Sequence, residues 1–283
     1  MKRLASLILL ALIIFQAAHA SPVTDGLNAY YQKEWSEAAS NFKQGIREDP
    51  KDSLALVYYI VSTFWLGTSE HELRDLEDAL IDNPNDQLTQ VKLGFFYYTK
   101  ALVRDQKPDR ALTEFRDAAR LGPSAIVHTG LGIAYFDVGN FTRAKKEFAR
   151  SMDMNSKDVL AYEYMGRILL SIDNDPEGAL AYFQQELKLV PQYPDGHYYC
   201  ASALDALGKS DEAIAEYQKT VSLDSLGVGR GTDAKIGLGD IYLQNKQFQD
   251  ARQAFQDALK LDPNNPVIKE RISQVDKAEK AKK

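Results

Sequence analysis

The segment from Thr232 to Asn265 constrains the fold most strongly, because it encodes a helical hairpin in 34 residues. Two stretches with apolar residues at helical spacing flank a polar turn at residues 244–247. Small residues stand where the helices would cross, and Pro263 ends the unit. The landmarks of this unit are Leu238, Gly239, Tyr242, Ala251, Phe255 and Pro263. The pattern predicts two antiparallel helices in close contact.

The same landmarks recur along most of the chain at this spacing, with one extra residue in the turn of the unit at 159–193 and a longer insertion in the unit at 87–124. The predicted units are residues 21–52, 53–86, 87–124, 125–158, 159–193, 194–227 and 232–265. Residues 266–283 have one apolar face and no partner helix, so we expect a terminal capping helix with a frayed end. One such hairpin is too small to bury its apolar face alone, so neighbouring units must stack.

This pattern resembles the tetratricopeptide repeat, which has a 34-residue period and the same Leu-Gly, Tyr, Ala, Phe and Pro landmarks. The resemblance implies an all-α, right-handed solenoid of about seven helix–turn–helix repeats, closed by a C-terminal capping helix. The unit at 53–86 departs most from the pattern, because Glu72 replaces the small residue that lets the helices approach. We therefore expect a splayed crossing there. Extra residues at 101–107 should lengthen the preceding hairpin.

Residues 1–20 have the pattern of a secretory signal peptide. Lys2 and Arg3 precede an apolar run at 4–17, and small residues flank a cleavage point near Ala20. We expect export and cleavage, which would place the chain in the periplasm or outside the cell with no remaining membrane span. The alternative is an uncleaved anchor, although the run is shorter than the ~20 residues that cross a bilayer.

Composition and charge limit the possible partners. The chain is 45% hydrophobic and can bury a continuous core. Its net charge is −6, and loss of two positive charges with the signal peptide would leave −8. Such an acidic protein has no electrostatic attraction to nucleic acid or anionic lipid. Cys200 is the sole cysteine, so an internal disulfide is excluded and a buried thiol is expected.

No motif points to catalysis, a cofactor or a metal. His128 and His197 occupy equivalent positions in first helices and are expected to pack. The glycine-rich segment Gly227–Gly231 lacks the preceding strand of a dinucleotide site and is expected to be a flexible linker. Residues 173–178 resemble the start of a calcium loop, but Gln184 stands where the closing glutamate should be. We therefore predict that the chain is not an enzyme.

The resemblance also implies where a partner would bind. In tetratricopeptide repeat proteins the first helix of each unit lines a concave groove. The matching residues here are Val57, Val61, Phe64, Trp65, Phe95, Tyr98, Ile133, Phe136 and Arg167. The amino-terminal half of this groove is apolar and aromatic, and the basic clamp that some members use for a terminal carboxylate is absent. We expect an apolar or amphipathic segment of a partner protein; the alternative is that these residues pack against neighbouring helices.

The sequence thus favours a non-enzymatic interaction scaffold or adaptor in the periplasm or secretory space. A regulatory or docking subunit of an envelope enzyme or assembly complex is the main alternative. An enzyme would need a catalytic domain, for which the repeats leave no room, and self-association through the groove remains open.

Overall fold

The computed structural model describes residues 21–282, which form helices joined by short turns, with no strand among them. The predicted signal peptide at 1–20 lies outside the described residues. The helices are α2 (Pro22–Tyr31), α3 (Trp35–Glu48), α4 (Ser53–Leu66), α5 (Ser69–Asp82), α6 (Gln87–Val103), α7 (Asp109–Leu121), α8 (Ala125–Asp137), α9 (Phe141–Met154), α10 (Val159–Ser171), α11 (Pro176–Leu189), α12 (Pro194–Ala206), α13 (Ser210–Leu223), α14 (Gly231–Gln244), α15 (Phe248–Leu261) and α16 (Pro266–Lys282).

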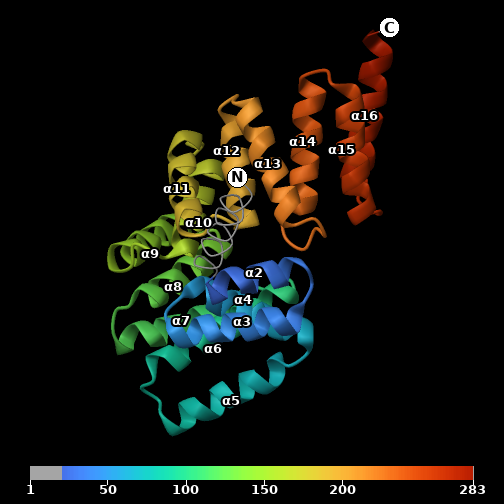
Figure 1. Cartoon of the computed structure of the whole chain (residues 1–283). Coiled ribbons are helices and arrows are strands. Elements are labelled where there is room, and N and C mark those ends of the chain that lie inside the picture. The colour runs from blue at the N-terminus through green and yellow to red at the C-terminus, as the bar shows by residue number, and fades with distance from the viewer. Residues whose placement is uncertain (1–20, 283) are drawn as a thin grey trace, which may run out of the picture.

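Each predicted unit contains two of these helices, and successive hairpins stack into a right-handed α-solenoid (Figure 1). This confirms the predicted fold class. Several first helices begin at an aspartate whose side chain accepts a backbone N–H, as Asp52 does from Ala55 at 2.9 Å. Asp86 and Asp158 cap α6 and α10 in the same way. Within residues 21–282, none of the helices combines the length and apolarity that a bilayer crossing requires.

The hairpins close through a ring stacked on a glycine. Phe148 on α9 is fully buried, and a Cβ atom added to Gly132 on α8 would lie 2.5 Å from its ring. The same contact recurs in four other units: Gly26 with Phe42, Gly94 with Phe115, Gly166 with Phe183, and Gly239 with Phe255. Any larger residue at these glycine positions would push the two helices apart, because a close-packed crossing has no spare volume.

The second hairpin lacks this close crossing, as we expected from Glu72. Helix α5 lies apart from α4 and packs mainly on α6 (Figure 1). Buried Ile60 stands at the repeat position that holds glycine in most other hairpins. Glu72 stands at the position of the alanine landmark, and Leu76 at the position of the phenylalanine landmark. The Tyr59 hydroxyl donates to both carboxylate oxygens of Glu72 at 2.5 Å, so the glutamate faces α4 across a polar contact. Substitutions at these three repeat positions therefore explain the splayed crossing.

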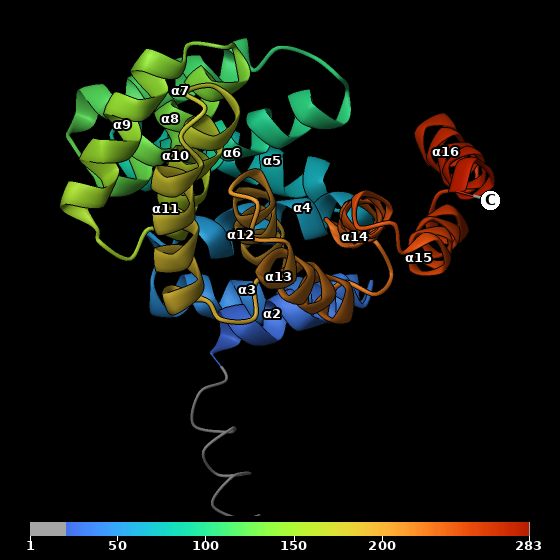
Figure 2. The same cartoon turned by 90° about the horizontal axis from the view of Figure 1, so that it is seen from above.

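The solenoid is tightly coiled, so its amino-terminal hairpins contact helices far along the chain. The Ser53 hydroxyl on α4 donates to Asp158 at 2.7 Å, across 105 residues of sequence. The Tyr31 hydroxyl on α2 donates to Asp195 on α12, across 164 residues. Seen from above in Figure 2, α12 and α13 stand over α2 and α3. These contacts close the coil, so that helices far apart in the sequence line the same inner face.

The carboxyl-terminal helices extend away from this closed part (Figure 1). Ile268 and Val275 of α16 are buried against α15, as expected of a cap. Arg252 on α15 binds Asp276 and Glu279 on α16, each at 2.8 Å. These ion pairs join α16 to α15, and α16 extends to Lys282.

Candidate protein-binding site on the concave face

A cavity of about 300 Å³ opens on the inner face of the coil. Its helical walls come from first helices alone, namely α2, α4, α6, α8, α10 and α12, and the loop after α13 completes it. Four of the predicted groove residues line it, which are Val57, Val61, Tyr98 and Ile133. These four predicted residues thus lie together at one cavity, whereas the sequence did not predict that distant helices would close it.

Tyrosine hydroxyls and carboxylates form a network along the cavity wall. Tyr58 donates to Asp195 at 3.2 Å and lies 2.8 Å from the Tyr31 hydroxyl. Tyr193 donates to Glu163 at 2.9 Å. Burial raises the pKa of Tyr31, Tyr58 and Tyr193 well above 10, so these hydroxyls remain neutral donors. The network fixes the amino-terminal hairpins against α10 and α12.

Two arginines complete the network. Arg167 binds Glu163 at 3.0 Å, and its guanidinium lies 4.4 Å from the ring centre of Tyr164 and 4.8 Å from that of Phe136. Arg230 binds Asp195 at 3.3 Å and donates to the Tyr199 hydroxyl at 2.6 Å. Such partly buried, stacked guanidiniums are held by several contacts at once. Arg167 is therefore committed to internal contacts, although the sequence suggested it as a groove residue.

The segment Gly227–Gly231 is an ordered loop and not a flexible linker. The buried Asp224 carboxylate accepts backbone N–H groups from Val228 and Gly229 at 2.8 Å, and from Gly231 at 2.7 Å. These bonds present Arg230 to the cavity. The prediction was wrong because glycine content indicates backbone freedom, whereas a buried carboxylate with three donors removes that freedom. An aspartate just before a glycine-rich stretch was the available signal.

The predicted groove residues differ widely in exposure. Phe95 is fully buried against Phe115, with ring centres 4.9 Å apart, and Ile133 is also buried. Phe95 is therefore a packing residue, which is the alternative that the sequence left open, and Ile133 packs in the core while it also lines the cavity. Val57, Val61, Phe64 and Phe136 are half-buried, and Tyr98 is buried at the cavity wall. Trp65 is 61% exposed and stacks on Trp35 at 5.4 Å.

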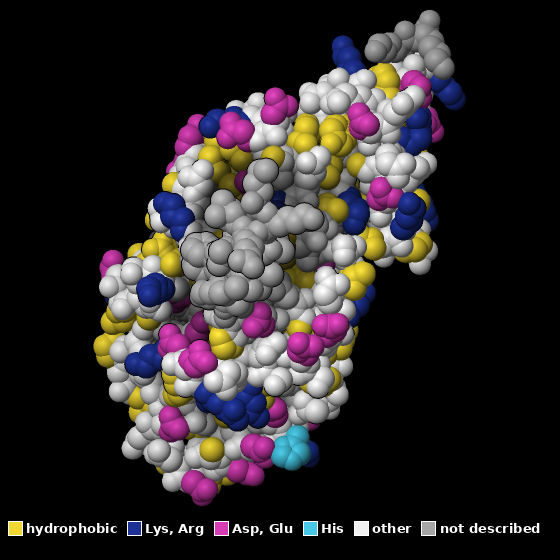
Figure 3. All heavy atoms as spheres, in the orientation of Figure 1, with side chains coloured by type: hydrophobic (Ala, Val, Ile, Leu, Met, Phe, Trp, Pro, Cys, Tyr) yellow, Lys and Arg dark blue, Asp and Glu magenta, His cyan; other side chains and the backbone are white. Residues whose placement is uncertain are grey.

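Large apolar side chains remain exposed at the carboxyl ends of two first helices, and we call them the apolar rim. The rim consists of Trp65, Leu66, Leu102 and Val103, at the carboxyl ends of α4 and α6. Leu102 is 62% exposed and also lines the cavity, so the rim and the cavity are continuous. In Figure 3 acidic and basic side chains are interspersed over the described surface, with hydrophobic groups between them. Leu102 and Val103 were not predicted, because they lie in the extra residues of α6.

The histidines and the cysteine have structural contacts. His128 and His197 each place Nδ1 2.6 Å from a glutamate on the paired helix, Glu147 and Glu216 respectively. Cys200 is buried as predicted, and burial raises the pKa of its thiol to about 12. Across residues 21–282, no group of three or more His, Cys, Asp or Glu side chains could hold a metal ion.

Comparison with known proteins agrees with this architecture. The family model "Tetratricopeptide repeat" matches residues 129–195 and 200–266. Curated relatives include the Hsp70-Hsp90 organizing protein 1 of Glycine max, 20% identical over 89% of this chain and 44% of its own length. Anaphase-promoting complex subunit 7 of Arabidopsis thaliana is 23% identical over 65% of this chain and 32% of its own length. The chain thus spans less than half the length of these two relatives.

Solved structures are similar in fold. A chain of the APC/C Cut9–Hcn1 hetero-tetramer superposes with a TM-score of 0.68 at 14% identity, over 87% of this chain and 47% of that one. A tetratricopeptide repeat protein from Parabacteroides merdae covers 90% of this chain and 97% of its own, with a TM-score of 0.53 and 17% identity. Proteins with this repeat generally mediate protein–protein interactions. By its repeats, their crossings and these matches, the chain belongs to the tetratricopeptide repeat family.

Proposed function

We propose that this protein is a non-enzymatic scaffold or adaptor that binds an apolar or amphipathic segment of a partner protein on its concave face. The observation that carries the proposal is the apolar rim, which continues into the cavity through Leu102. Apolar side chains exposed beside a cavity are typical of protein-binding surfaces.

The rim and the cavity together would supply the apolar contacts for a partner segment. Trp65 and Leu102 offer broad apolar contacts, and each side chain buried in the complex contributes ~1.5–3 kcal/mol. The half-buried Val57 and Val61 continue this surface inward. Since association itself costs several kcal/mol, a few such anchors support an affinity in the micromolar range. A regulatory or docking subunit of an envelope enzyme or assembly complex would use the same contacts, with an enzyme as the partner.

The test is a double variant of the rim, Trp65→Ser with Leu102→Ser. Both side chains are exposed, so the helical fold should be preserved, with only a small loss of stability from the Trp65–Trp35 stack. Photo-crosslinking in the source organism from position 61, which lines the cavity, should trap one dominant partner, and the double variant should reduce that product at least tenfold. The control is Ile81→Ser, which removes a 76% exposed apolar residue from α5. Equal crosslinking by the double variant and the control would contradict the proposal.

We further propose an extracytoplasmic location, supported by the signal-peptide pattern of residues 1–20. Fractionation of the source organism should recover the chain outside the cytoplasm, with Ser21 as its first residue. A product that still begins at Met1 and is recovered with cytoplasmic enzymes would exclude export, whatever the result of the crosslinking.

A further inference from the structure

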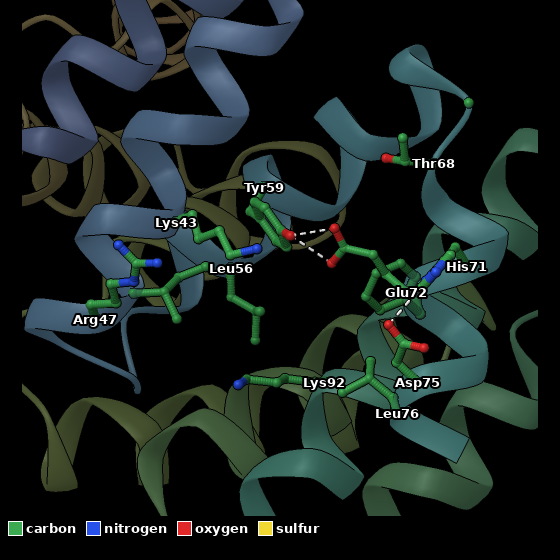
Figure 4. Close-up of a pocket in the computed structure, with 13 residues that line it drawn as sticks. Lys43, Arg47, Leu56, Tyr59, Thr68, His71, Glu72, Asp75, Leu76 and Lys92 are labelled. Carbon is green, nitrogen blue, oxygen red and sulfur yellow. Dashed lines mark hydrogen bonds and ion pairs between the residues drawn. The ribbon is translucent and has the colours of Figure 1, made fainter. Parts of the chain in front are cut away.

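A second, larger hollow lies where α5 separates from α4. This cleft has a volume of about 710 Å³, with α3 and α5 as its walls and α4 and α6 as its floor (Figure 4). Leu56 and Tyr59 face it from α4, whereas Val57, Tyr58 and Val61 of the same helix face the concave cavity. The two hollows share no lining residue, so the cleft is a separate site.

The shape of the cleft follows from the missing helix contact. In the other six hairpins the second helix packs along the first, and in this hairpin α5 does not cover α4. Leu56 and Phe96 in the floor and the half-buried Ile46 and Leu76 in the walls form an apolar trough. A trough between two helical walls, above a helical floor, is the arrangement that accepts another helix.

Charge is distributed unevenly around the trough. Lys43 and Arg47 on α3 and Lys92 on α6 project from one side, and none of them forms an ion pair with residues 21–282. Glu72 and Asp75 on α5 are on the other side, where Glu72 contacts Tyr59 and Asp75 pairs with His71 at 3.0 Å. Lys43 also lies over the Tyr59 ring, 5.8 Å from its centre, so a partner carboxylate on the α3–α6 side would compete only with this weak contact, whereas both carboxylates on α5 already have internal contacts.

We propose that this cleft binds an amphipathic helix of a partner protein, with its apolar stripe in the trough and acidic residues along the α3–α6 side. Opposite charges at the edge fix the orientation and speed association, and the apolar stripe contributes most of the affinity. The partner helix takes the place along α4 that α5 leaves open.

The experiment is a selection of displayed random 16-residue peptides on the full chain. Enriched peptides should carry apolar residues at helical spacing with acidic residues on one edge, and become helical on binding. A double variant, Lys43→Glu with Arg47→Glu, should weaken their binding at least tenfold. The matched control is Lys146→Glu with Lys219→Glu, two exposed lysines on α9 and α13, which should leave affinity unchanged.

Three outcomes would overturn the proposal: enrichment of extended or non-amphipathic peptides, equal binding by the charge-reversed variant, or light scattering that shows a second copy covering the cleft. The Trp65→Ser/Leu102→Ser variant separates the two sites. It should retain helix binding in the cleft even if it loses its partner on the concave face.

Discussion

Glu186 on α11 is fully buried, and neither carboxylate oxygen has a hydrogen-bond partner among the described residues. Burial raises its pKa well above 4.5, and the nearby carboxylates of Glu163 and Asp195 add to the shift while Arg167 opposes it. Between the unfolded and folded pKa values the folded protein therefore holds one more proton. Stability is complete below the unfolded pKa and is lost as the pH rises through the folded one.

Replacement of Glu186 by Met should therefore raise the free energy of unfolding at pH 8 by ~1–3 kcal/mol, because an apolar side chain needs no hydrogen-bond partner. At pH 5 the gain should be smaller, since the raised pKa favours the neutral glutamate at lower pH. Urea denaturation at both pH values measures the difference. Glu177→Met, an exposed glutamate on the same helix, is the control and should show no such pH dependence. Equal destabilisation by Glu186→Met at both pH values would contradict this account.

At the scale of single elements, α5 is the least anchored helix of the amino-terminal hairpins. Only Ser69 and Leu73 are buried along its 14 residues, whereas α3 buries Phe42 and three small residues at its crossings. The sequence indicated this through Glu72. The contribution of Ile60 and Leu76 became clear only when the packed columns could be compared with the other hairpins.

We expect the backbone amides of α5 to exchange with solvent faster than those of α3 and α7, since few buried contacts oppose its local opening. Hydrogen–deuterium exchange of the free protein should show this difference within α5 alone. Addition of a cleft-binding helical peptide should slow the exchange of α5. Protection of α5 equal to that of α7 in the free protein would indicate that its contacts with α6 suffice.

At the scale of the whole molecule, the closure of the coil depends on Asp195. Its carboxylate accepts hydrogen bonds from Tyr31 and Tyr58 of the amino-terminal hairpins and pairs with Arg230 of the ordered loop. The Asp195 side chain is only 14% exposed. Loss of such a group leaves buried partners unpaired, which costs more than the contact itself contributed.

Asp195→Ala should lower the free energy of unfolding by ~2–4 kcal/mol and increase the radius of gyration, as α2 and α4 separate from α12. Thermal denaturation and small-angle scattering measure these two effects. The control is Asp233→Ala, which removes the other carboxylate on Arg230 at a 43% exposed position. It should cost less than ~1 kcal/mol, because surface pairs contribute little. An unchanged radius for Asp195→Ala would show that apolar contacts alone close the coil.

The helical hairpins, their number, the splay at Glu72 and the capping helix were readable from the sequence, because each depends on residues within about 34 positions of one another. The sequence likewise placed Val57, Val61 and Tyr98 at the inner face. Only the tertiary structure decided that Phe95 is buried while Leu102 is exposed, and that Arg230 enters the cavity. The physical reason is that exposure depends on what the coil brings together, and Tyr31 meets Asp195 across 164 residues that no local pattern relates.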